Sequence, residues 1–258
     1  MKVKHIIALA VLIAAAFIPS RALPQEMPEM VTDRPDQTES TNVVKPGYVQ
    51  IETGLLLTHA GGSDVTEIPG SLARIGLIDK LEIRIGIDGW IADEAADKTE
   101  FGDSEISAKY FLAEENGWIP ESAILAGVGI PTSKGSEDPG YSVRYAGAYT
   151  LIGRLSAGFN VAGAWEKGAG QSGGEALNMS MMYSAVIGCG INDHAACFLE
   201  FFGESPVDAG GKPSNLIDGG FTYLVTDWFQ FDAYGGIGMT DEAEDWFFGT
   251  GFSWLFGY

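Results

Sequence analysis

From residue 46 onward the sequence repeats one pattern, in which a segment of roughly ten residues with alternating apolar and polar side chains is followed by a turn. Leu81, Ile83 and Ile85 alternate with Glu82 and Arg84, so one face of this segment is apolar and the other is charged. A period of two residues is the signature of a β-strand. We therefore predict twelve strands, at Gly47–Thr58, Glu67–Leu77, Leu81–Ile91, Phe101–Ala113, Glu121–Pro131, Gly140–Leu151, Arg154–Trp165, Glu175–Cys189, Ala196–Glu204, Asn215–Val225, Trp228–Gly238 and Trp246–Tyr258.

Alternation alone fits two architectures, a soluble sandwich whose apolar face packs on a core and a membrane barrel whose apolar face contacts lipid. The predicted connections distinguish them, because they alternate long and short without exception. The long ones are Gly61–Val65, Asp93–Glu100, Ser133–Asp138, Lys167–Gly174, Asp208–Pro213 and Met239–Asp245, and the short ones are Asp79-Lys80, Glu115–Gly117, Ile152-Gly153, Asn192–His194 and Asp227. Outer-membrane barrels show this asymmetry between outer loops and periplasmic turns.

In lipid, every backbone N–H and C=O group must find its partner inside the protein, and a sheet achieves this only by closing on itself. The fold class is therefore predicted to be all-β, an antiparallel transmembrane β-barrel of about twelve strands over residues 46–258, with both termini in the periplasm. A periplasmic β-sandwich is the alternative. Twelve strands would enclose a narrow lumen, wider than the filled interior of an eight-stranded barrel.

The last segment carries the most specific signal. Its aromatic residues alternate with small ones up to the final position of the sequence. Phe252, Trp254, Phe256 and Tyr258 resemble the C-terminal aromatic signature that is read by the barrel assembly machinery, which makes that machinery a predicted partner. The alternative is an ordinary buried edge strand. Exposed apolar edges invite aggregation, which argues against a soluble protein with such a terminus.

The first residues resemble an export signal. Lys2 and Lys4 precede a continuous apolar run from Ile6 to Ile18, and cleavage is predicted after Ala22, so that residues 1–22 form a signal peptide. Cleavage after Ala16 and an uncleaved anchor are the alternatives. Removing three basic residues changes the charge to 12 − 35 = −23 from the formal −20 of the whole chain. Such an acidic protein is not expected to bind nucleic acid.

A charged motif, TDRPDQTES, spans residues 32–40 and is followed by PGYVQIETG at residues 46–54. These residues resemble the outer-membrane family that is named for a MetA pathway of phenol degradation and described as transporter or porin-like barrels. The resemblance implies location and architecture, and it carries no catalytic residues across. With Asp33, Arg34 and Asp36, the motif is too polar for a membrane strand. We favour a periplasmic leader or short cap over residues 23–45; the alternative is a plug in which Arg34 pairs with carboxylates of the lumen. A separate hypothesis is that Arg34 pairs with Glu52 or Glu82.

The polar faces of the predicted strands should line the lumen. These candidates are Glu52, Glu82, Arg84, Asp88, Glu105, Lys109, Arg144, Asn160, Asn178, Glu200 and Asp232. A set of mixed sign either filters solutes or pairs internally and fills the barrel. The predicted loops carry the carboxylates Asp93, Glu94, Asp97, Glu100, Glu137, Asp138, Asp241, Glu242, Glu244 and Asp245. They form either a cation-attracting rim, in contact with lipopolysaccharide through divalent ions, or a solvated loop surface.

Other chemistry has little support in the sequence. No metal site or cofactor is predicted, because the spacing of a calcium or zinc motif is missing. Cys189 and Cys197 would face each other across a hairpin with a three-residue turn, and a disulfide between them is left open. A lipid hydrolase or acyltransferase would need His59 together with Ser63 or Ser71. Neither serine lies in a Gly-x-Ser-x-Gly motif.

The function predicted from the sequence is therefore an outer-membrane channel or transporter for small solutes, with hydrophobic or aromatic ones suggested by the family resemblance. Outer-membrane lipid and lipopolysaccharide are the predicted surroundings. The alternatives are a closed structural or adhesion-type barrel and a lipid-modifying enzyme of the outer membrane.

Overall fold

The computed structural model describes residues 27–134, 138–169, 175–208 and 210–258. The predicted signal peptide lies outside these residues. Among the described residues are fourteen β-strands that form one antiparallel sheet. They are β1 (Tyr48–Ala60), β2 (Ser63–Ile78), β3 (Leu81–Ile87), β4 (Trp90–Asp93), β5 (Lys98–Phe101), β6 (Ser104–Ala113), β7 (Glu121–Ile130), β8 (Tyr141–Thr150), β9 (Leu155–Ala169), β10 (Glu175–Gly190), β11 (Ala195–Pro206), β12 (Ser214–Thr226), β13 (Phe229–Gly238) and β14 (Trp246–Gly257).

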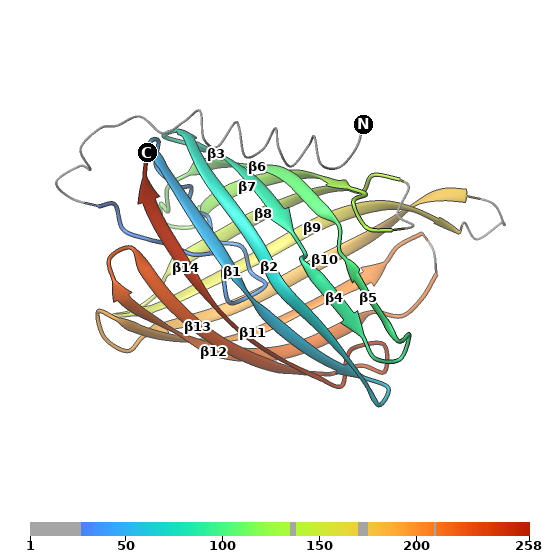
Figure 1. Cartoon of the computed structure of the whole chain (residues 1–258). Coiled ribbons are helices and arrows are strands. Elements are labelled where there is room, and N and C mark those ends of the chain that lie inside the picture. The colour runs from blue at the N-terminus through green and yellow to red at the C-terminus, as the bar shows by residue number, and fades with distance from the viewer. Residues whose placement is uncertain (1–26, 135–137, 170–174, 209) are drawn as a thin grey trace.

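The sheet closes into a barrel because β1 pairs with β14 on one side and with β2 on the other (Figure 1). β2 pairs with both β3 and β4, so these two are parts of one crossing, and β5 with β6 forms the next. Fourteen strands therefore make 14 − 2 = 12 crossings. The predicted closed barrel of twelve strands is confirmed. The predicted continuous strand Leu81–Ile91 is wrong in one respect, since it breaks at Gly89, whose φ of 77° is unfavourable for a regular strand.

The two faces of the barrel differ as the alternation predicts. Along β14, buried and exposed residues alternate from Trp246 to Phe256. Phe252 and Trp254 point outward with 39% and 47% of their surfaces exposed, whereas Ser253 between them points inward and is fully buried. Exposed aromatic side chains are favourable on this outer face only because it contacts lipid rather than water. None of the residues that the structure describes form a helix with the length and hydropathy of a membrane span.

The connections correct one prediction. The first hairpin was expected to have a long loop at Gly61–Val65, but β1 and β2 continue to Ala60 and Ser63, which leaves a two-residue turn. Gly61 and Gly62 both have positive φ, which such a tight turn requires. Conversely, residues 114–120 form a longer connection than the short one that was predicted. The strict alternation is thus wrong, because strand pairing extends into the first loop. We call the end with the C-terminus the turn end and the opposite end the loop end.

Candidate functional site in the barrel lumen

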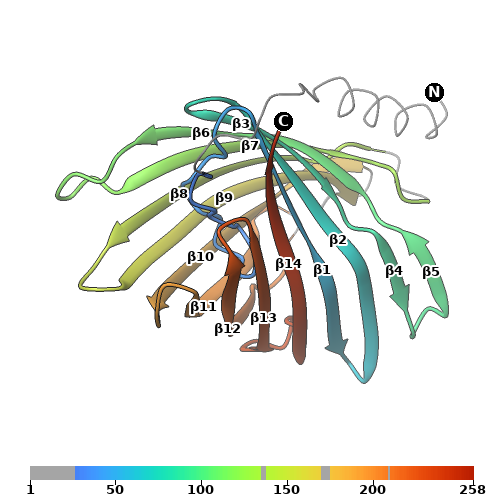
Figure 2. The ribbon, with the colours of Figure 1, turned by 60° about the vertical axis from the view of Figure 1, so that its left-hand side comes forward.

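Residues 27–45, which we call the lumen segment, run inside the barrel ahead of β1 (Figure 2). The segment connects to β1 at the turn end, where Met30 and Val44 pack with Tyr48 and Leu255. Gly76 on β2 permits this approach, since an added Cβ would lie 2.1 Å from the carbonyl oxygen of Lys45. The expectation of a periplasmic leader or cap is therefore wrong for the described part of this segment, and the plug alternative holds. The physical reason is that the polar groups of the segment find buried hydrogen-bond partners in the lumen. A leader outside the barrel would be solvated by water instead.

The lumen segment crosses the barrel, because it bonds to side chains on strands all around the wall. Its hydrogen bonds and ion pairs reach Glu52 on β1, Arg74 on β2, Glu82 and Arg84 on β3, Lys109 on β6, Glu121 on β7, Arg144 on β8, Asn160 on β9, Ser184 on β10, Glu200 on β11 and Gln230 and Asp232 on β13. A short segment that contacts opposite walls must occupy the lumen between them.

Asp33 is the centre of the contacts on one side. Its carboxylate lies 2.6 Å from the Arg84 guanidinium, 2.8 Å from the Lys109 ammonium group and 3.0 Å from Arg74. Burial alone would raise the pKa of Asp33, but the positive charges of Arg74, Lys109 and Arg84 outweigh burial and hold it well below its usual range. Asp33 therefore fastens the lumen segment to three strands through its ion pairs.

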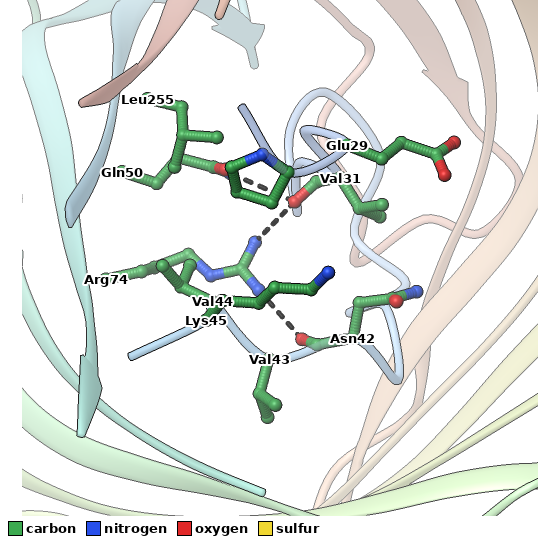
Figure 3. Close-up of a pocket in the computed structure, with 10 residues that line it drawn as sticks. Glu29, Val31, Asn42, Val43, Val44, Lys45, Gln50, Arg74 and Leu255 are labelled. Atoms are coloured by element: carbon green, nitrogen blue, oxygen red, sulfur yellow. Dashed lines mark hydrogen bonds between the residues drawn. The ribbon is translucent and has the colours of Figure 1, made fainter. Parts of the chain in front are cut away.

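Arg74 supports this arrangement from the wall and is itself fully buried. Its guanidinium group lies 3.0 Å from Glu52 and 2.9 Å from Glu82, and it also donates to the carbonyl oxygens of Val31 and Asn42 (Figure 3). One side chain thus binds two wall carboxylates and both ends of the lumen segment. Beside it is a cavity of about 160 Å³, which opens between the segment and the wall.

Arg34 fastens the segment to β13, which is separated from β1 by β14 in the closed sheet. Its guanidinium group lies 2.9 Å from Asp232 and 5.6 Å from the centre of the Tyr234 ring. Gly54 and Gly251, which are register partners, make room for it, because a Cβ on either would lie 2.5 Å from the Arg34 Nη2 atom. The predicted pairing of Arg34 with Glu52 or Glu82 is wrong. The Arg34 backbone N–H donates to Glu52 at 2.8 Å, whereas its side chain lies over Gly54 and Gly251 and binds Asp232.

The third attachment is acidic. Glu200 accepts hydrogen bonds from the Gln37 N–H at 2.7 Å and from the Thr38 hydroxyl at 2.5 Å. Burial raises the pKa of Asp36 well above its usual range, and the negative charge of Glu200 raises it further. Here the segment meets carboxylates rather than cations.

Comparison with known proteins identifies the family. Residues 32–256 match the family described as "Putative MetA-pathway of phenol degradation". The chain belongs to this family. The match covers residues 32–45 of the lumen segment and nearly the whole barrel, so in this MetA-pathway member most of the inward-folded segment is part of the family domain. No significant match was found among the curated proteins.

Solved structures with a similar fold are outer-membrane barrels. The COG4313 outer membrane channel from Pseudomonas putida F1 has a TM-score of 0.61 and 12% identity, covering 86% of this chain and 99% of that one. The NanC porin has a TM-score of 0.57 and 10% identity over 80% and 98% of the two chains. The KdgM porin has a TM-score of 0.52 and 9% identity over 81% and 99%. At these identities the likeness establishes the fold, and it agrees with the predicted outer-membrane location.

The inward positions predicted for the MetA-pathway chain fall into two groups. Six of the charged candidates are buried inside the barrel, namely Glu52, Glu82, Arg84, Lys109, Glu200 and Asp232, as is Asn160. Arg144 is half-buried and donates to the Gln37 carbonyl oxygen and to Asn160. Asp88 and Glu105 are exposed, and Asn178 lies on β10. Several of the acidic loop residues are paired locally, as in the Lys98–Glu100 and Lys212–Glu242 contacts.

Two important inward residues were missed. Arg74 was not among the predicted lumen residues, although it alternates in phase with Leu72 and Gly76 and is the register partner of Arg84. Asp218 was overlooked in the same way, although it is the register partner of Glu200. In both cases the alternation of inward and outward side chains could have been counted along the strand from a residue whose direction was already assigned. That count would have indicated that the side chain points inward.

The remaining candidates lie away from the lumen segment. Cys189 and Cys197 are register partners on β10 and β11, which confirms the predicted facing arrangement, and both are free thiols. The His59 ring contacts the Asp64 carboxylate at 2.5 Å and stacks on Trp246. Ser71 bonds instead to Thr53, which lies six residues, or about 20 Å, along the strand from His59. A pairing of His59 with Ser71 is thereby excluded.

Proposed function

We propose that the protein is an outer-membrane channel that conducts small solutes past the lumen segment. The observation that carries this proposal is the division of the barrel into an apolar outer face and a charged inner face that binds a chain segment through polar contacts. Such contacts can exchange with water and solute, whereas an apolar filling would exclude both. The channel fold of the similar structures supports the same function.

Small phenols are the substrates that we propose to test first. The family description refers to phenol degradation, and a phenol is small, apolar over its ring and able to hydrogen-bond through its hydroxyl group. The cavity of about 160 Å³ beside Arg74 and Gln50 offers both kinds of contact, because Val31, Val44 and Leu255 line it too. It lies at the turn end, which we propose to be the periplasmic side.

A closed structural barrel is the second candidate, and the many bonds of the lumen segment favour it. Single-channel conductance of the refolded full chain in a planar bilayer tests both. The channel proposal expects discrete current steps, and competition by phenol that exceeds competition by cyclohexane. Silence from a protein that is shown to be folded and inserted would overturn it and support the closed barrel.

We propose no catalytic role. His59 is held between Asp64 and Trp246, and no observation favours a nucleophile beside it. Phospholipase assays on the wild type and on His59→Ala are expected to give equal background rates, and a difference would contradict the absence of a catalytic role.

The barrel assembly machinery and lipopolysaccharide remain proposed partners. The outward aromatic residues of β14 and the acidic loops support this proposal.

A further inference from the structure

Glu200 and Asp218 form a pair of buried carboxyl groups inside the barrel. They are register partners on β11 and β12, and both side chains point into the lumen. Only 1% of Glu200 and 3% of Asp218 is exposed. Directly opposed residues on one face of a sheet have Cβ atoms about 5 Å apart, so their carboxyl groups are within reach of each other.

The two carboxyl groups have different partners. Glu200 accepts hydrogen bonds from the Gln37 N–H and from the Thr38 hydroxyl. Both oxygens of Asp218 are buried, and no N–H or O–H group in the described part of the chain donates to them. Instead, Asp218 lies in an apolar surrounding, against Gly236 and beside the buried cluster of Leu216, Tyr234 and Phe247. An unpaired carboxylate in such a place is strongly unfavourable.

The neighbouring charges offer no compensation. Among the described residues, the other charged or titratable groups near the pair are Arg34 and Asp36 on the lumen segment, Arg144 on β8, and Asp232 and Tyr234 on β13, with Asp33 further along the segment. Arg34 is bound to Asp232, and Arg144 donates to Gln37 and Asn160. Negative charges of Glu200 and Asp218 also raise the pKa of Asp36, after burial itself.

A proton fits this pair better than a metal ion does. Within the described residues, no three His, Cys, Asp or Glu side chains lie together in a way that could hold a metal. Two adjacent buried carboxyl groups cannot both be ionised without large repulsion, and one shared proton removes it. The O–H of Asp218 would then donate to Glu200, which keeps its two bonds to the lumen segment.

We propose that Glu200 and Asp218 hold one proton between them, and that this proton fastens the Asp36–Thr38 corner of the lumen segment to the wall. When the proton leaves, two adjacent anions stand beside Asp36, and the repulsion is relieved by moving the corner away and admitting water. The lumen therefore widens as pH rises. This consequence for conduction rests on the proposed channel function, whereas the proton and the attachment do not.

Hydrogen exchange of the refolded full chain in detergent tests the attachment without any current. The Gln37 N–H donates to the Glu200 carboxylate, and the Glu39 N–H donates to the neutral Asn160 side chain, which makes Glu39 an internal control. In the wild type, the protection of Gln37 relative to Glu39 is expected to fall by about tenfold or more between neutral and alkaline pH. In Asp218→Asn, whose amide can donate to Glu200, the ratio should stay constant.

Infrared spectra test the proton itself. The wild type should show the C=O stretch of a protonated carboxyl group at neutral pH, weakened in Asp218→Asn and unchanged in the exposed control Glu105→Gln. An unchanged band in Asp218→Asn, or a Gln37-to-Glu39 ratio that ignores pH in the wild type, would overturn the inference. If both readouts behave as expected while the bilayer stays silent, the proton site stands and it is the channel function that fails.

Discussion

On the side of the lumen formed by β1, β2, β3 and β6, three buried cations face carboxylates of the wall and of the lumen segment. We call this the cationic side, and its members are Arg74, Arg84, Lys109, Asp33, Glu39, Glu52 and Glu82. On the acidic side, formed by β11, β12 and β13, the carboxyl groups are Asp36, Glu200, Asp218 and Asp232, and in the described part of the chain Arg34 pairs with Asp232. The same segment is thus held by fixed charges on one side and by charges that must be neutralised on the other.

The difference between the two sides indicates which contacts of the lumen segment should persist when the pH changes. A buried ion pair that loses one partner leaves an uncompensated charge, which costs far more than the pair contributes. Asp33, Glu39, Glu52 and Glu82 each have a cation within 4 Å, so these contacts should hold at any physiological pH. The acidic side depends on protons, and its strength should follow pH.

The largest effect is expected from breaking the cationic side at Arg74. Arg74→Met leaves Glu52 and Glu82 without their main partner and should lower the free energy of unfolding by about 3–5 kcal/mol. Urea titration of the inserted protein, followed by heat-modifiable gel mobility, measures it. Arg144→Met is the matched control, since Arg144 is half-buried and its hydrogen bonds in the described part of the chain go to the neutral groups of Gln37 and Asn160. Equal losses in the two variants would refute the distinction.

Removing the charge of Asp33 should loosen the segment on the cationic side, where Arg84 still pairs with Glu39, while leaving the wall pairs of Arg74 intact. Asp33→Asn is expected to raise single-channel conductance several-fold and to lower the free energy of unfolding by about 1–3 kcal/mol. Asp232→Asn frees only Arg34 and should raise conductance less. If the Asp232 variant conducts better, then the acidic side is the main attachment.

The two sides should respond to pH with opposite sign. The pKa of Asp33 is held below its unfolded value of about 3.9, so its contribution to stability is present above that value and is lost as pH falls through the folded-state pKa. The pKa of Asp36 is raised, so its contribution is present below about 3.9 and is lost as pH rises through the folded-state value. The free energy of unfolding of Asp36→Asn should therefore fall less at alkaline pH than that of the wild type. The same pH profile as the wild type would contradict this.

A smaller effect is expected from crowding Arg34. Gly54→Ala places a methyl group where the guanidinium lies and should cost about 1–3 kcal/mol while weakening the Asp232 contact. Gly86→Ala is the matched control, because an added Cβ there meets Glu105 at an ordinary 3.7 Å. Thermal unfolding of both variants measures the difference, and indistinguishable melting would show that Arg34 moves freely.

The smallest effect should come from an exposed inward carboxylate. Glu105→Gln is expected to change the free energy of unfolding by less than about 0.5 kcal/mol, because water already solvates this side chain. Its cation selectivity should fall slightly at low salt and match the wild type at high salt. A large change in the free energy of unfolding would mean that the charge of an inward carboxylate, rather than its burial, decides how much it contributes to stability.

The sequence by itself determined the strands, their two faces and the closed barrel, because a period of two is a local property that each strand carries in its own residues. It placed Glu52, Glu82 and Lys109 inside for that reason, and the break at Gly89 shows how little local detail it missed. Only the tertiary structure decided the position of the lumen segment and the partners of Arg34, Arg74 and Asp218. A polar segment such as residues 32–40 suits water and a polar lumen equally well, and which carboxylate an arginine reaches depends on strands distant in sequence that barrel closure brings together.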